Sequence, residues 1–206
     1  MVAYSKGKSQ SDSSKQKPEI SVPLSSQACE ELKALGLEFQ EGKVSAPIDG
    51  IKAVEGRSQI SKRAISASHV LNEAYDYAKP SSFSRGMRVE LPGVSMLFLS
   101  GTASVDEDGK TVHPGDFAAQ CLRTFRNLTC LLASESASWH DVIRTTCYLK
   151  NIERDYGDFN EIRTMFMKSI GLDPLPASTG IQAKLCRPDL LVEIEAIAVV
   201  PNSHAK

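Results

Sequence analysis

The stretch MRVELPGVSMLFLSG at residues 87–101 contains two short apolar runs, Met87 to Leu91 and Ser95 to Ser100. Between these runs stands Pro92-Gly93, a dipeptide typical of the tight turn that joins two strands. The stretch therefore predicts a β-hairpin, and this hairpin is the first piece of a sheet.

The rest of the sheet is predicted downstream. Asp116 opens a helical segment whose apolar residues recur every three or four positions, at Phe117, Cys121, Phe125, Leu128 and Leu132. A β-branched strand follows at 142–149, a second helix at 155–170, and two strand-like runs at 180–185 and 190–200. The order hairpin, helix, strand, helix, strand, strand predicts an α+β fold. Its single mixed sheet carries both helices on one face.

The opposite face of such a sheet needs a partner, because an apolar face left open in water promotes aggregation. Self-association into a closed ring of subunits is the expected solution, and it would create clefts between the subunits.

Upstream, the chain is less regular. Residues 1–18 are mostly polar and are predicted to be a disordered tail. Residues 19–78 are predicted to be an N-terminal extension, with a short helix after Ser25, a small hairpin within 42–56 and a weakly helical run at 65–80 that Pro80 ends. Residues 79–201 form the predicted main domain.

Composition narrows the function classes. The 206 residues are 41% hydrophobic and 24% charged, with a formal net charge of −1. Without a basic surplus, nucleic acid is not expected as a partner. Neither a membrane span nor a secretory leader is recognisable, so we expect a cytoplasmic protein that does not bind membranes. Five cysteines without a CxxC pair predict free thiols.

The last strand carries the most informative side chains. In LLVEIEAIAVV, Glu193 and Glu195 are two residues apart and so project from one sheet face, together with Leu191, Ile197 and Val199. Burial among apolar neighbours raises a carboxyl pKa, as a general acid or base near neutral pH requires. Alternatively, this face is solvated at one end, or each glutamate forms a salt bridge at an interface.

Two further groups are candidate ligand contacts. Ser178, Thr179 and Gly180 follow two prolines, and a rigid turn there would offer hydroxyl and N–H groups to a carboxylate. Asn160 and Arg163 are three residues apart on the second helix, so the arginine could bind an anion bidentately. The four histidines lack metal-ligand spacing and no cofactor-binding loop is present, so neither a metal nor a cofactor is expected.

Several of these motifs together resemble the RidA/YjgF family, also described as endoribonuclease L-PSP-like or as reactive intermediate deaminases. The resemblance covers residues 80 to 200. It rests on FSRG at 83–86, FLSGTASVDEDGK at 98–110, RNLTCLL, DVIRTTCYLKNIERDY at 141–156, LPAS at 175–178 and VEIEAIAV at 192–199.

The resemblance implies a compact chorismate mutase-like fold and a homotrimer with three clefts at the subunit interfaces. Each cleft would bind a small molecule. Carried over by position, the cleft residues are Phe83, Ser84, Ser100, Gly101, Asn160 and Glu193.

One position departs from the family pattern. Deaminating members have Pro-Ala-Arg-Ser where this chain has Pro-Ala-Ser178-Thr179, and the family's neighbouring cysteine is Gly180 here. Losing such a charge-assisted contact forfeits about 1.5–3 kcal/mol of binding. Arg85 or Arg163 could replace the missing guanidinium.

Three functions are therefore considered. The first is a metal-free hydrolase of a small carboxylate or carbonyl compound, with Glu193 orienting water and either Arg85 or Arg163 holding the anion. It is not a classical imine deaminase, and SGTAS and PASTG also resemble the chorismatase branch. The second is a trimer that binds a metabolite or a protein without catalysis. The third, ribonuclease activity, follows only from a family label, and the sequence has no basic groove or aromatic platform for it.

Overall fold

The computed structural model describes residues 22–35, 37–41, 43–45, 60–68, 70–77 and 80–202. The chain forms two compact units, Met1–Ser58 and Gln59–Lys206. The predicted tail at 1–18 lies outside the described residues. The extension predicted over 19–78 is divided between the two units, because the second unit begins at Gln59.

The first unit contains one helix and one small hairpin. Helix α1 (Ser26–Ala34) is capped by the side chain of Ser25, which accepts a hydrogen bond from the amide of Ala28. Strand β1 (Glu38–Gln40) pairs antiparallel with β2 (Lys43–Ser45). Most of the hairpin region predicted at 42–56 lies outside the described residues.

The second unit contains the predicted mixed sheet. Its six strands lie in the order β3-β4-β5-β8-β6-β7. Only the β6–β7 pair is parallel. The bounds are β3 (Lys62–Ala64), β4 (Gly86–Leu91), β5 (Val94–Ala103), β6 (Val142–Leu149), β7 (Ala177–Gln182) and β8 (Val192–Pro201). The predicted hairpin is confirmed as β4 and β5.

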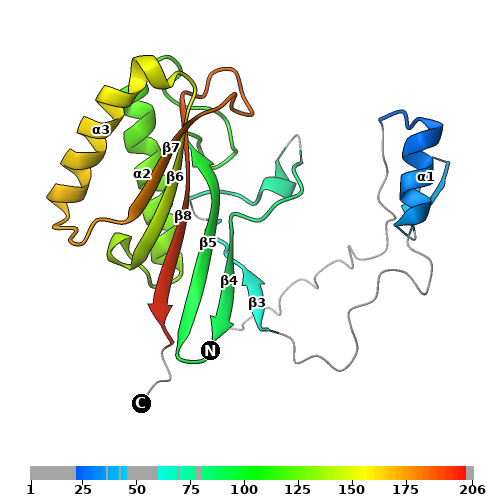
Figure 1. Cartoon of the computed structure of the whole chain (residues 1–206), viewed down its shortest axis with the longest axis horizontal. Helices are drawn as coiled ribbons and strands as arrows, with labels where there is room; N and C mark the ends of the chain where they lie inside the picture. The colour runs from blue at the N-terminus through cyan, green and yellow to red at the C-terminus, as the bar shows by residue number, and fades with distance from the viewer. Residues whose placement is uncertain are drawn as a thin grey trace, which may run out of the picture. The chain divides into compact units, whose positions relative to one another are not determined.

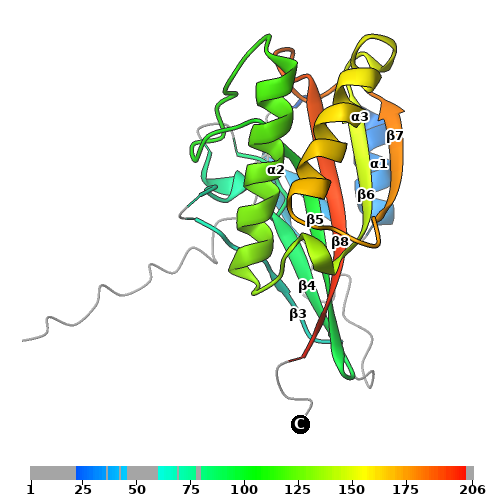
Figure 2. The same ribbon diagram turned by 90° about the vertical axis from the view of Figure 1, so that its left-hand side faces the viewer.

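Helices α2 (Phe117–Ser134) and α3 (Ile152–Ser169) cover one face of the sheet, as predicted (Figures 1 and 2). Asp116 caps α2 through the amide of Ala119. Between the helices and the sheet, the ring of Phe125 stacks on Phe166 at 4.8 Å and meets Trp139 edge-on. Of the helices that the structure describes, none is both long and apolar enough to cross a bilayer.

Strand β8 separates the two faces of the sheet. Alternate residues from Val192 to Val200 are buried against the helices, whereas Glu193, Glu195 and the residues in step with them are only half-buried on the other face. This open face also exposes Phe98, which pairs with Ile197, and Ile181, which is in register with Tyr148.

Two predicted elements were wrong. Ser178, Thr179 and Gly180 do not form a turn but lie inside β7, because this edge strand starts at Ala177 and pairs with β6. Of residues 65–80, those that the structure describes are not helical apart from the short 3-10 turn Ala74–Asp76. Here tertiary packing overrides the weak helical pattern, since Ile65 and Leu71 are fully buried in the core.

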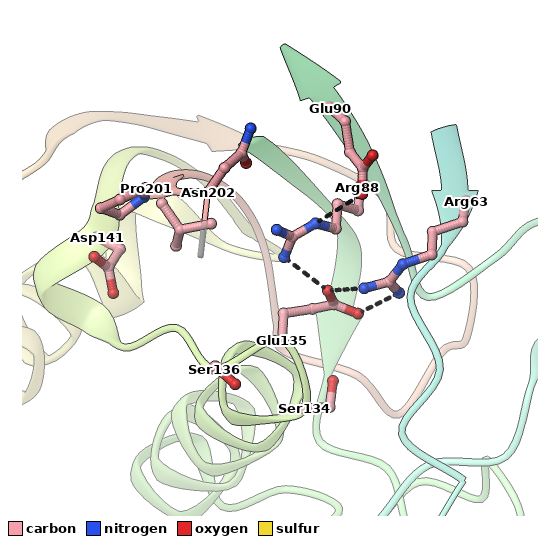
Figure 3. A pocket seen from close by; sticks show the side chains of 10 residues that line it. Arg63, Arg88, Glu90, Ser134, Glu135, Ser136, Asp141, Pro201 and Asn202 are labelled. Atoms are coloured by element: carbon pink, nitrogen blue, oxygen red, sulfur yellow. Dashed lines mark hydrogen bonds and ion pairs between the residues drawn. The ribbon is translucent and has the colours of Figure 1, made fainter. Parts of the chain in front are cut away.

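A salt-bridge cluster fixes the edge strand β3 to the end of α2. The carboxylate of Glu135 accepts both Nη groups of Arg63, at 2.7 and 2.6 Å, and also Nη1 of Arg88 at 3.2 Å (Figure 3). The side chain of Glu135 is only 3% exposed, so the two arginines compensate a buried charge.

Candidate functional site

Strands β5 and β8 bring Gly101 and Glu193 together. The two strands pair antiparallel with Ala103 opposite Glu193, and their register shifts between Leu99 and Thr102. Gly101 lies in this irregular stretch, and the carboxylate of Glu193 lies directly over its Cα. Because Gly101 has no side chain, there is room for the carboxylate of Glu193 at this position.

The surroundings of Glu193 favour its neutral form. Burial raises the pKa of this carboxyl above its ordinary value, and the negative charge of Glu195 raises the pKa further. The positive charge of Arg187 acts in the opposite direction. A carboxyl group with a raised pKa is suited to exchange protons closer to neutral pH.

Arg85 is the buried cation of the same region, with only 6% of the residue exposed. Its Nε and Nη2 both donate to the carbonyl of Asn72, at 3.0 and 2.9 Å. Its guanidinium carbon lies 4.9 Å from the ring centroid of Tyr77 and 5.6 Å from that of Phe83. These contacts fix the group while leaving Nη1 out of the bonds to Asn72.

These side chains line one cavity of about 420 Å³. Phe83, Arg85, Gly101 and Glu193, all predicted site residues, contribute to its wall. The volume falls in the range of small-molecule sites. A guanidinium, a group that can bind anions, and a carboxyl group, which can exchange protons, thus line the same cavity.

Ser84 and Ser100 support this wall without lining it. The hydroxyl of Ser100 donates to the carbonyl of Ser84 at 2.8 Å, and the amide of Ser100 donates to the carbonyl of Arg85 at 3.1 Å. They connect the segment before β4 to strand β5, so the structure gives both serines a scaffold position.

Asn160, Arg163 and Ser178 lie together in a different, smaller groove of about 170 Å³. Nη1 of Arg163 donates to Ser178 Oγ at 2.9 Å, and Nη2 donates to Asn160 Oδ1 at 2.8 Å. The guanidinium also lies over the ring of Phe159, with its carbon 5.1 Å from the centroid. Within one chain, Arg163 does not share the cavity of Glu193.

The last two predicted residues line neither space. Thr179 accepts a hydrogen bond from Nη2 of Arg144 at 3.1 Å, and Gly180 is exposed next to the ring of Tyr156. The expected cluster of Ser178, Thr179 and Gly180 is therefore split, because neighbours along a strand point to opposite faces.

A larger groove of about 540 Å³ lies around Glu135, Arg63 and Arg88 (Figure 3). There the arginines are already bonded to a carboxylate. In the cavity of Glu193, by contrast, neither Arg85 nor Arg187 forms an ion pair with a carboxylate of the described residues. The cavity of Glu193 is therefore the better candidate for an anion.

Among the lining residues of this cavity that sequence reasoning missed, Tyr77 and Arg187 bear most on its chemistry. Tyr77 stands in the extension, where the weak helical pattern gave no reason to expect a site. Arg187 belongs to the loop CRPD, interpreted only as a connection between strands. A signal was available, since this loop leads directly into the strand that carries Glu193.

Within the described part of the chain, no group of three or more histidine, cysteine, aspartate or glutamate side chains is placed to hold a metal ion. Its cysteines are free, and burial raises the pKa of Cys121 to about 12 and raises that of Cys147. Neither thiol is activated by these surroundings.

Fold and cavity together define a class of protein. The sequence model of the endoribonuclease L-PSP family matches residues 78–200. The chain belongs to this family, which is the RidA/YjgF family that the motifs resemble.

Individual proteins are similar to parts of this chain. The 3-aminoacrylate deaminase RutC of Acinetobacter baylyi is 29% identical over 106 residues, which is 52% of this chain and 80% of that protein. A chorismatase of Streptomyces rapamycinicus is 28% identical over 148 residues, 68% of this chain and 43% of that protein. The crystal structure of the YjgF gene product of E. coli has a TM-score of 0.54 at 24% identity, covering 66% of this chain and 98% of that one.

Proposed function

We propose that this chain is a hydrolase of a small carboxylate or carbonyl compound and that it works with protein side chains alone. One observation carries the proposal: the carboxyl group of Glu193 and the guanidinium of Arg85 line the same cavity. The relative named a 3-aminoacrylate deaminase supports chemistry on a small carboxylate.

Arg85 is proposed to hold the substrate carboxylate. Nη1 of Arg85 takes no part in the hydrogen bonds to Asn72. The rings of Tyr77 and Phe83 shield the guanidinium from water. Between the two arginines left open by the sequence, this favours Arg85, because Arg163 is bonded to Ser178 and Asn160 in another groove.

Glu193 is proposed to activate water. In its ionised form the carboxylate accepts a proton while the water oxygen bonds to the electrophilic carbon of the substrate, and the same proton then passes to the leaving group. The raised pKa brings this exchange closer to neutral pH. Classical deamination that depends on the β7 arginine is not proposed, because Ser178 stands at that position.

We further propose that three copies associate through the open sheet face, in the cytoplasm. Support comes from the exposed Phe98 and Ile181 on that face. In such a ring the groove of Arg163 from one copy would complete the cavity of Glu193 in the next, which would unite the residues that one chain keeps apart.

A chorismatase-like hydrolase is the second candidate. The match to the chorismatase spans 148 residues, whereas the family model matches only residues 78–200. Some of the chain outside the family region therefore has a counterpart there. Hydrolysis of the enolpyruvyl ether of a chorismate-like substrate would release pyruvate.

The test is turnover by the full chain of enzymatically generated 2-aminoacrylate, 3-aminoacrylate and chorismate, measured as ammonia or pyruvate. We expect one substrate to be hydrolysed and Glu193→Gln to abolish it. The exposed Glu161→Gln is the matched control and should keep full activity. Saturable binding without turnover would favour the non-catalytic binding trimer instead, and turnover unaffected by Glu193→Gln would overturn the role of Glu193.

A further inference from the structure

A second arginine faces the cavity of Glu193. Arg187 comes from the loop before β8, whereas Arg85 precedes β4, so the two guanidinium groups approach from different segments. The proposed function needs only Arg85 to bind a carboxylate. It leaves Arg187, the second cation of the cavity, without a role.

A continuous chain of contacts connects the two arginines. Nη1 of Arg187 donates to the carbonyl of Gly109. Gly109 has a φ of +75° and lies against the ring of Tyr77, where a Cβ would be 2.7 Å from Cε1. The guanidinium carbon of Arg85 lies 4.9 Å from the centroid of the same Tyr77 ring. Arg187 and Arg85 are thereby linked through Gly109 and the ring of Tyr77.

The two arginines differ in the carboxylates that lie near them. Glu73, buried at 6% exposure, supports the positive charge of Arg85, although neither of its carboxylate oxygens has a hydrogen-bond partner among the described residues. The carboxylate nearest to Arg187 in sequence, Asp189, instead accepts a hydrogen bond from Thr111. Arg187 lines the cavity and acts on Glu193 through its charge, but it forms no ion pair with a carboxylate of the described residues.

We propose that the cavity takes a dicarboxylate, with one carboxylate on Arg85, the other on Arg187, and Glu193 beside the carbon chain between them. This inference rests on the proposed function and names its substrate class. Each arginine already donates part of its guanidinium to a carbonyl, so each has room for one carboxylate.

The experiment is calorimetric titration of the full chain with succinate and glutarate, and with succinamate and glutaramate, in which one carboxylate is replaced by an amide. We expect each diacid to bind about tenfold to a hundredfold more tightly than its monoamide. Arg187→Gln should remove this difference while leaving the affinity for the monoamide unchanged. Arg187→Lys, which keeps the charge, should restore part of it, and the exposed Arg126→Gln should change nothing.

The possible failures are distinguishable. Equal affinity for diacid and monoamide, or an equal loss of both in Arg187→Gln, would overturn the dicarboxylate and leave the proposed function standing. Tighter binding of inorganic phosphate than of either diacid would also overturn it. If neither the diacids nor the monoamides bind, the carboxylate cavity of the proposed function falls as well.

Discussion

The carboxylate of Glu193 occupies the space that a side chain at Gly101 would fill. A Cβ at residue 101 would overlap Oε1 of Glu193 and would lie 3.0 Å from its Cδ. Gly101 on β5 therefore leaves the space that Glu193 on β8 needs for its carboxylate. The position of the proposed base thus depends on a residue without a side chain.

Gly101→Ala should displace the carboxylate of Glu193 and lower the rate of hydrolysis by about 100-fold, since small misplacements of a reacting group are costly. Only the end of a flexible side chain has to move, so the free energy of unfolding should change by less than about 1 kcal/mol. Steady-state kinetics and urea unfolding measure the two effects. Gly157→Ala on α3, where a Cβ meets open space, is the control. Full activity of Gly101→Ala would contradict the assigned position of the base.

Stability should depend on pH through Glu193. Its pKa is raised in the folded chain, so the folded state holds a proton that the unfolded chain has released. This contribution is complete below the ordinary glutamate pKa of 4.5 and is lost as the pH rises through the folded pKa. The unfolding free energy of the wild type, relative to Glu193→Gln, should therefore decrease as urea titrations move upward from pH 4.5. A difference that stays constant or grows would show that the group is not buried in this way.

Ser178→Arg places on β7 the guanidinium that the family resemblance implies at this position, and its effect should depend on the neighbouring charges. Arg163 already donates to Ser178 Oγ, so a second guanidinium there meets a like charge. We expect little imine hydrolysis from Ser178→Arg alone and more from Ser178→Arg combined with Arg163→Phe. Ammonia release from 2-aminoacrylate measures both. If the double variant is no more active than the wild type, the cleft lacks more than this one arginine.

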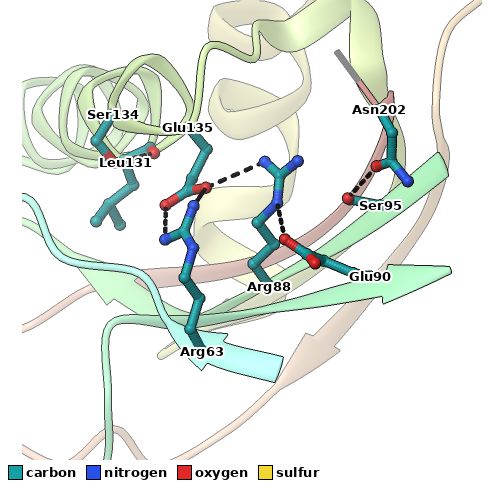
Figure 4. Close-up of polar contacts among 8 residues, drawn as sticks. All are labelled: Arg63, Arg88, Glu90, Ser95, Leu131, Ser134, Glu135 and Asn202. Carbon is teal, nitrogen blue, oxygen red and sulfur yellow. Dashed lines mark hydrogen bonds and ion pairs between the residues drawn. The ribbon is translucent and has the colours of Figure 1, made fainter. Parts of the chain in front are cut away.

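Glu135 should be important for stability and not for activity (Figure 4). Replacing it by glutamine leaves Arg88, whose side chain is only 14% exposed, without its buried carboxylate partner. We expect a loss of about 1.5–3 kcal/mol in the free energy of unfolding. Arg63→Gln should cost less, because the side chain of Arg63 is 55% exposed. Equal losses from both variants would mean that burial does not decide the strength of this cluster.

Most of the main fold follows from local patterns. Pro92-Gly93 predicted the hairpin, the spacing from Phe117 to Leu132 predicted α2, and the alternation in 142–149 predicted β6. These signals are strong because a period of two or of 3.6 residues places a whole set of apolar side chains on one face.

The site was harder to predict, because its parts meet only through packing. The residues from Ser178 to Gly180 were expected in a turn, yet pairing with β6 extends β7 over them. Tyr77 and Arg187 enter the cavity from loops without periodicity. The alternation of β8 placed Glu193 on the open sheet face, but it could not show that Arg85, and not Arg163, lines the same cavity.

The affinity of the full chain for pyruvate, a small 2-oxo acid, tests the central claim most directly. Arg85→Gln is the variant of choice, because glutamine removes the positive charge but keeps a polar side chain. Calorimetry should show binding about tenfold to a hundredfold weaker in Arg85→Gln and unchanged in Arg126→Gln. If Arg85→Gln binds pyruvate as tightly as the wild type, the cavity of Glu193 and Arg85 is not the carboxylate site.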